Sequence, residues 1–182
     1  MVNMGIWAKL GAALGLSATP RAHYGVKVRT TYHVECYGAD GRLRWVDEAD
    51  NIVVTSGLNK LLDATLKTGL ASPTWYLGLK NSAAGIVLAD TLASHAGWTE
   101  TTSTYSGNRK TWTPGTIAAG SVDNSGSVAV FSMTGTVTIY GCLMCDQATG
   151  TSGILYGAVD FSTSRSVASG DTLNVTVTCS VS

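Results

Sequence analysis

The sequence predicts a mainly β protein: an antiparallel β-sandwich or jelly-roll-like domain with one short α-helix and an N-terminal arm. Residues 101–182 carry only seven charged side chains and are otherwise rich in Ser, Thr, Gly and β-branched residues. Apolar and polar residues alternate along several short segments, and turn residues separate these segments at the spacing typical of sandwich or barrel strands. Strand-like segments far outnumber helix-like ones, which excludes a parallel α/β fold.

At 182 residues the chain is long enough for one domain with a sizeable core and an arm. We assign residues 1–22 to an N-terminal arm that docks on a neighbouring subunit, and residues 23–182 to a single β-sandwich domain. The arm contains the apolar run 5–16, which needs an apolar groove on a partner to leave water. The arm residues that we expect at this interface are Ile6, Trp7, Leu10 and Leu14.

The same apolar run could instead belong to a secretory signal peptide, because a possible cleavage region follows it up to Ala22. A signal peptide normally starts with basic residues, whereas residues 1–4 contain no Lys or Arg and Lys9 interrupts the apolar run. Three glycines also weaken a helix in this run. We therefore favour the arm and keep the signal peptide as the alternative.

The first half of the domain is predicted to contain a β-hairpin. Apolar and polar residues alternate over residues 26–36, which indicates an amphipathic strand with one buried face. A turn is expected at residues 38–41. Leu43 and Trp45 continue the alternation after the turn, so we expect their segment to pair with the first strand. Residues 52–54 form a third short apolar run.

The hydrophobic period then changes from two to three or four residues, which predicts one α-helix of about three turns. The hydroxyls of Thr55 and Ser56 suit the start of this helix, and Gly69 suits its end. We expect the helix to close the open end of the sandwich or to pack beneath a neighbouring subunit. Its apolar stripe consists of Leu58, Leu61, Leu62 and Leu66.

The second half of the domain is again predicted to be rich in strands. Residues 75–79 resume strand character, whereas residues 81–100 show neither period and are expected to leave the sheets as a long excursion. Together with the earlier runs, the expected strands number about eight or nine, as is typical of a sandwich or barrel. The later strands are expected at residues 108–113, 127–132, 136–145, 154–159 and 173–181.

Composition and charge limit the classes of function. A hydrophobic content of 45% with 13% charged residues argues against disorder. The net charge of zero lacks the basic excess that binding to a nucleic-acid backbone requires, so nucleic acid is not an expected partner. No apolar run is long enough to span a membrane. Because low net charge promotes association, much of the surface is expected to be covered by other subunits.

Two groups of residues suggest chemistry, but both have simpler explanations. Cys142 and Cys145 have the spacing of a zinc or redox pair, yet a strand would point them to opposite faces and a second ligand pair is missing. Asp47, Glu48 and Asp50 could bind calcium or act as glycosidase carboxylates, but we expect a solvated turn. We therefore predict no catalytic, metal-binding or cofactor-binding residue, no cofactor, and a protein that is not an enzyme.

The aromatic residues offer a further possible binding surface. Five tryptophans and seven tyrosines could form a platform on which sugars stack. Trp45 and Trp75 lie in strand patterns and are expected in the core. His95 and Trp98 lie in the irregular excursion, and aromatic residues in loops often anchor protein interfaces. We therefore expect His95 and Trp98 at a contact with a neighbouring subunit.

Several blocks of the sequence together resemble a family of small structural proteins encoded by tailed bacteriophages and prophages. The likeness extends from about His33 to the C-terminus, and the first thirty residues lie outside it. Both head decoration and tail or fibre roles are associated with sequences of this kind. The blocks that carry the resemblance are residues 75–79 (WYLGL), 89–100 (ADTLASHAGWTE), 122–132 (VDNSGSVAVFS) and 170–175 (GDTLNV).

The resemblance implies a capsid decoration, or cement, protein that clamps adjacent capsomers and stabilises the head. Its expected partners are the major capsid protein and copies of itself in a dimer or trimer, with no nucleic acid and no membrane. Its expected location is the outer surface of the head of the virion, after assembly in the host cytoplasm. The alternatives are a tail or head-fibre module that binds a host receptor or glycan and, less favoured, a secreted bacterial enzyme or adhesin.

Overall fold

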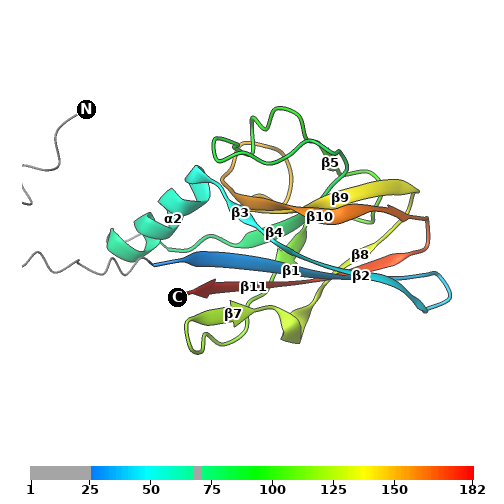
Figure 1. Ribbon diagram of the computed structural model, residues 1–182, viewed down its shortest axis with the longest axis horizontal. Coiled ribbons are helices and arrows are strands. Elements are labelled where there is room, and N and C mark those ends of the chain that lie inside the picture. Colours follow the sequence, from blue (N-terminus) through cyan, green and yellow to red (C-terminus); the bar gives the residue numbers. More distant parts are fainter. Residues whose placement is uncertain (1–25, 68–70) are drawn as a thin grey trace, which may run out of the picture.

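The computed structural model describes residues 26–67 and 71–182, which form two antiparallel β-sheets packed face to face (Figure 1). The protein is mainly β, as the sequence predicts, and the arrangement is that of a β-sandwich. Residues 1–22, assigned above to the arm, lie outside the described residues, as does the expected helix end at Gly69.

The first sheet has its first and last long strands side by side at its centre. β1 pairs with β11 over its whole length, in a register that places Val34 opposite Val175. β1 also pairs with β2, which confirms the predicted hairpin. The strands of this sheet are β2 (Leu43–Asp50), β1 (Val28–Tyr37), β11 (Thr172–Val181), β7 (Ser121–Asp123) and β8 (Ala129–Ser132), with both β7 and β8 on β11. A short 3₁₀ helix, Ser125–Ser127, joins the last two in sequence.

The second sheet is built around a hairpin of two long strands, β9 and β10. The remaining strands extend this sheet on both sides. Its order is β3 (Ile52–Val53), β10 (Leu155–Val167), β9 (Val137–Cys145), β4 (Trp75–Lys80) and β5 (Glu100–Thr101), and β6 (Lys110–Trp112) also pairs with β4. The sequence missed the short strands β5 and β7 and the polar second half of β10.

The core between the sheets follows the predicted alternation. In β1 every second side chain from Thr30 to Cys36 is buried, because successive side chains of a strand point to opposite faces. The partner strand β11 buries Leu173, Val175 and Val177 in the same way. Two sheets with one apolar face each therefore make the main core.

A second core covers the outer face of the second sheet. The segment 81–99 folds back over this face, so that residues 141–145 of β9 and 155–159 of β10 are buried on both sides. Cys142 belongs to the main core and Cys145 to the second core, which confirms that the two thiols point to opposite faces of β9. The second core consists of Val54, Ile86, Leu92, Trp98, Leu143, Cys145, Leu155 and Ala158.

The α-helix α2 (Thr55–Leu66) follows β3 and lies at one end of the sandwich (Figure 1). Its predicted cap is wrong: Val54 holds the N-cap position, and the Ser56 hydroxyl donates instead to the carbonyl oxygen of Leu155, at 2.7 Å. Gly57 is the helix's closest contact with β10, because a Cβ at this position would clash with the Tyr156 carbonyl. This glycine lets the helix backbone rest directly on the sheet.

Candidate functional site

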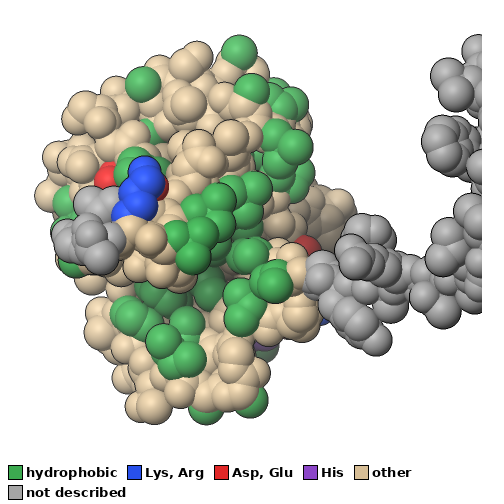
Figure 2. Space-filling view, turned by 90° about the vertical axis from the view of Figure 1, so that its left-hand side faces the viewer, with side chains coloured by type: hydrophobic (Ala, Val, Ile, Leu, Met, Phe, Trp, Pro, Cys, Tyr) green, Lys and Arg blue, Asp and Glu red, His purple; other side chains and the backbone are tan. Residues whose placement is uncertain are grey.

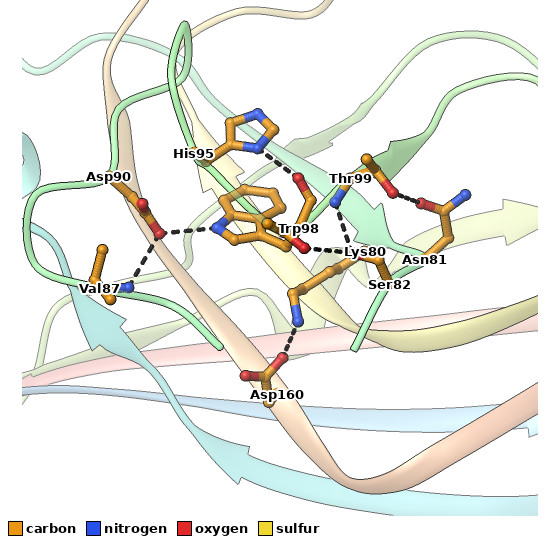
Figure 3. A network of polar contacts seen from close by, with 10 residues as sticks. Lys80, Asn81, Ser82, Val87, Asp90, His95, Trp98, Thr99 and Asp160 are labelled. Atoms are coloured by element: carbon orange, nitrogen blue, oxygen red, sulfur yellow. Dashed lines mark hydrogen bonds and ion pairs between the residues drawn. The ribbon is translucent and has the colours of Figure 1, made fainter. Parts of the chain in front are cut away.

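The excursion 81–99 is held down by a buried tryptophan and its polar partners (Figure 3). Trp98 is only 1% exposed, and its Nε1 donates to Oδ2 of Asp90 at 2.8 Å. The backbone N–H of Val87 donates to the same oxygen at 3.0 Å, so one carboxylate closes the loop from both ends. Asp90 is itself buried, and buried carboxylates need such donors.

The expectation that Trp98 faces a neighbouring subunit therefore needs correction. Its indole is buried in the second core of its own chain. A side chain that is inaccessible to solvent is also inaccessible to a neighbouring subunit. His95 is half-buried and stacks on the Trp98 ring with centroids 3.8 Å apart. Its Nδ1 donates to the Trp98 carbonyl oxygen at 2.8 Å. His95 thus supports the loop from outside and keeps one partly open face.

A buried ion pair lies next to this loop, between the end of β4 and the middle of β10. Lys80 and Asp160 both lie opposite Gly141 of the intervening strand β9. Because Gly141 has no side chain, the Lys80 side chain can cross β9 and reach the Asp160 carboxylate (Figure 3). Lys80 is completely buried, whereas the Asp160 side chain is 40% exposed. The amine is thus withheld from solvent and cannot attack an external substrate.

A second buried pair anchors the other end of the excursion. Arg109 donates from Nε and Nη2 to the two carboxylate oxygens of Glu100, at 2.8 and 2.6 Å. Its Nη1 donates to the carbonyl oxygens of Gln147 and Gly150, each at 2.9 Å. This two-pronged geometry is the strongest that an arginine makes with a carboxylate. Arg109 therefore ties the excursion to the turn between β9 and β10.

We expected the acidic residues of the first hairpin to form a solvated turn. They lie in a strand, β2, instead, and Asp47 is buried, with its side chain 2% exposed. Its Oδ2 accepts hydrogen bonds from Arg165 Nη2 at 2.7 Å and from the Ser162 hydroxyl at 3.1 Å. Asp47 thus joins the first sheet to β10 of the second. The Asp50 carboxylate is exposed and pairs with Arg29.

The thiols show no sign of activation. Burial raises the pKa of Cys145 and of Cys36 to about 11, and raises that of Cys142 further. Such thiols stay protonated and are neither nucleophiles nor ready metal ligands at neutral pH. Within residues 26–67 and 71–182, no three His, Cys, Asp or Glu side chains are grouped so that they could hold a metal ion.

The tryptophans of the described part do not form an open platform for sugars. Trp75 and Trp112 are buried, which confirms the core position predicted for Trp75. Trp45 is half-buried and packs against the core, with the Arg165 guanidinium over its ring at 5.5 Å. Trp98 is also buried, so three of these four tryptophans are at most 9% exposed.

An apolar groove lies open at the end of the sandwich, between α2 and the segment that follows β6. Figure 2 looks at this end of the molecule and shows hydrophobic side chains in a band across a hollow. The groove has a volume of about 490 Å³, and every residue that lines it is uncharged. Its walls include Leu61 and Ala64 from α2, Trp75 and Trp112 from the second sheet, Ile117, and Tyr156 from β10.

The helix beside this groove exposes most of its apolar stripe. Leu62 is 56% exposed and Leu66 is 78% exposed, whereas Leu61 is partly buried against the core. Ile117, on the opposite wall, is 74% exposed. The four leucines of the helix predict an apolar face, which we expected to be covered by the domain or by a neighbouring subunit, and the structure leaves three of them, Leu58, Leu62 and Leu66, exposed. The groove itself depends on residues from distant segments and had no sequence signature.

Comparison with known proteins leaves the family of this chain open. No protein-family model matches the sequence, and no curated protein matches it. In the described ranges, no helix combines the length and the apolar character needed to cross a bilayer. The protein is mainly β, with two packed antiparallel sheets and an open apolar groove at one end.

Proposed function

We propose that the protein is a structural component of a bacteriophage virion, a capsid decoration protein that clamps adjacent capsomers on the outer surface of the head. The observation that carries this proposal is the open apolar groove beside α2, with Ile117 exposed on its wall and Leu62 and Leu66 exposed elsewhere on the same helix. A contiguous apolar surface on a folded protein usually marks a contact with another molecule. The sequence blocks that resemble phage structural proteins give that contact its context.

The polar interior supports a structural role in preference to catalysis. The buried charges Lys80, Arg109 and Asp47 each have an opposite charge as partner. The Lys80 and Asp47 pairs link segments that are 80 and 118 residues apart, and Arg109 also donates to the distant carbonyl oxygens of Gln147 and Gly150. Groups engaged in this way hold a fold rigid and are not free to bind or transform a substrate. A rigid module is suited to transmit load between the units that it connects.

The clamping mechanism follows from buried area. Each subunit would span a boundary between capsomers and bury surface against the major capsid protein and against copies of itself, as a dimer or trimer. Stable protein interfaces bury roughly 1,200–2,000 Å² in total. Separating two capsomers would first have to expose that area to water, which raises the free-energy cost of opening the shell.

A reconstruction of the assembled particle tests this function. We expect the β-sandwich at every capsomer boundary on the outside of the head, at hundreds of copies per particle. Shells that lack the protein should open at lower temperature than decorated shells, as measured by light scattering or calorimetry. Finding the chain only at the tail, in a few to tens of copies, would instead establish the alternative, a tail or head-fibre module.

That alternative has less support in the described residues. A receptor- or glycan-binding module would use exposed aromatic faces, whereas Trp75, Trp98 and Trp112 are buried and Trp45 is half-buried beneath Arg165. The exposed apolar surface instead comes from aliphatic side chains on α2 and at Ile117. The groove that contains Ile117 also has Trp75, Trp112 and Tyr156 in its walls but no charged residue. Such an apolar groove suits an apolar protein segment better than a sugar, whose recognition also needs hydrogen bonds.

A further inference from the structure

The apolar groove continues to the point where the described chain begins. A second hollow of about 270 Å³ is lined by Val28, the first residue of β1, and shares Leu61, Ile117 and Tyr156 with the groove. The two hollows therefore form one apolar channel from the start of β1 to the helix. Charged residues contribute nothing to the walls of either hollow, so the channel selects an apolar occupant.

We propose that this channel is the docking site for the apolar segment 5–16 of a neighbouring copy of the chain. The segment GIWAKLGAALGL, residues 5–16, contains Lys9 as its one charged residue and has Ile6, Trp7, Leu10 and Leu14 as large apolar side chains. Such a segment matches an uncharged channel in chemistry. From α2, the channel is lined by Leu61, Ala64 and Thr65.

The chain length between the segment and the channel permits this exchange. Nine residues, 17–25, separate Leu16 from Val26. Fully extended, they reach about 30 Å, which is about the diameter of a small domain. That the segment comes from a neighbouring copy rests on the proposed role in a multi-subunit assembly.

Photochemical cross-linking of the full-length protein tests this docking. Trp7 is replaced by the photoreactive residue p-benzoylphenylalanine, and the irradiated products are separated by mass on a denaturing gel. We expect a product of twice the chain mass whose cross-link, mapped by mass spectrometry, lies on Leu61, Ala64 or Ile117. A cross-link to the channel within a single chain would overturn the exchange between copies. Cross-links elsewhere, or none, would overturn the channel as the docking site.

A pair of helix variants provides the control. Ala64 lines the channel, whereas Asn59 is exposed on the same helix and does not line it. We expect Ala64→Trp to fill the channel and lower the yield of the double-mass product about tenfold, and Asn59→Trp, which adds the same indole elsewhere, to leave the yield within about twofold. Equal yields from the two variants would contradict the proposal.

The outcome is separable from that of the proposed function. Cross-linking uses the isolated protein, whereas the capsid role is tested by locating the chain on a particle. If Trp7 cross-links to the channel of another copy but the protein does not bind shells, the docking site is supported and the capsid role is contradicted. Binding to shells by a protein whose Trp7 does not reach the channel would do the reverse.

Discussion

The excursion 81–99 and the helix α2 both pack against the second sheet, but they differ in how far their apolar side chains are buried. The excursion 81–99 has no regular structure, yet it buries Leu92 and Trp98 almost completely. The helix α2 is regular and amphipathic in sequence, yet it leaves Leu62 and Leu66 exposed. Regular secondary structure and burial are therefore separate properties in this molecule.

The difference lies in what attaches each segment to the sheet. The excursion has polar anchors at several points: Asp90 binds the Trp98 indole, Asn81 donates its backbone N–H to the Thr99 carbonyl oxygen at 2.9 Å, and Glu100 binds Arg109. The helix rests on β10 mainly through the close approach at Gly57 and the Ser56 hydroxyl. The hydrogen bonds of the excursion fix its backbone against the sheet, so that its apolar side chains are buried. The helix has fewer such contacts, and Leu62 and Leu66 stay exposed.

Substitution of Trp98 is expected to have the largest effect on stability. Trp98→Ala would leave a cavity in the second core and remove a donor from the buried Asp90 carboxylate. We expect a loss of about 3–5 kcal/mol in the free energy of unfolding, measured by urea denaturation. If the loss were below about 1 kcal/mol, the excursion would be a loosely attached loop and the contrast with α2 would fail.

Trp98→Phe separates the two contributions. The phenyl ring keeps most of the apolar area but cannot donate to Asp90, which retains the Val87 N–H at 3.0 Å. We expect a loss of about 1–2 kcal/mol, because one buried acceptor loses a partner while the core stays largely filled. Equal losses from Ala and Phe would mean that the hydrogen bond, and not packing, holds the excursion.

The pair of Lys80 and Asp160 tests the same closed region by its charge. Asp160→Asn would leave the fully buried Lys80 ammonium without a carboxylate, whereas Lys80→Met would leave a carboxylate that is 40% exposed and can take up water. We expect Asp160→Asn to cost about 2–3 kcal/mol and Lys80→Met about 1 kcal/mol or less, both measured by urea denaturation. The opposite order would indicate that water reaches Lys80 and that the excursion does not seal this face.

The sequence predicted the sandwich well because strand periodicity translates directly into burial. In β1, alternation alone places Tyr32, Val34 and Cys36 in the core, and no distant residue is needed for that conclusion. The same rule placed Cys142 and Cys145 on opposite faces. It gave no guidance on the excursion, because an irregular backbone has no period and the pairing of Asp90 with Trp98 becomes visible only in three dimensions.

The sequence misjudged charges whose partners lie far away along the chain. Asp47 stands among acidic neighbours, which suggested a solvated turn, but its partner Arg165 lies 118 residues later. The spacing of the four helix leucines predicts an apolar stripe, but a stripe indicates only that a surface is apolar. Whether the same chain covers that surface depends on which other segments pack against it in three dimensions. In this fold no segment covers Leu62 and Leu66 within the described residues.

The smallest expected effect is that of replacing an exposed leucine of α2 by serine, and the same replacement in the excursion 81–99 serves as the comparison. Leu62→Ser on α2 removes an exposed side chain, and we expect it to change the free energy of unfolding by less than about 0.5 kcal/mol. Leu92→Ser in the excursion makes the identical change at a residue that is 1% exposed, and we expect a loss of about 3–5 kcal/mol. Both are measured by urea denaturation at a protein concentration low enough to prevent association.

Association provides the second half of this comparison. Because Leu62 is an exposed apolar side chain on the helix that forms one wall of the groove, Leu62→Ser should weaken self-association, measured by sedimentation at increasing concentration, even though it leaves unfolding nearly unchanged. Leu92→Ser should affect association only as far as it unfolds the protein. A large loss of stability from Leu62→Ser would mean that the helix stripe is packed within its own chain after all, and the apolar surface available to another copy would then be confined to the groove walls around Ile117.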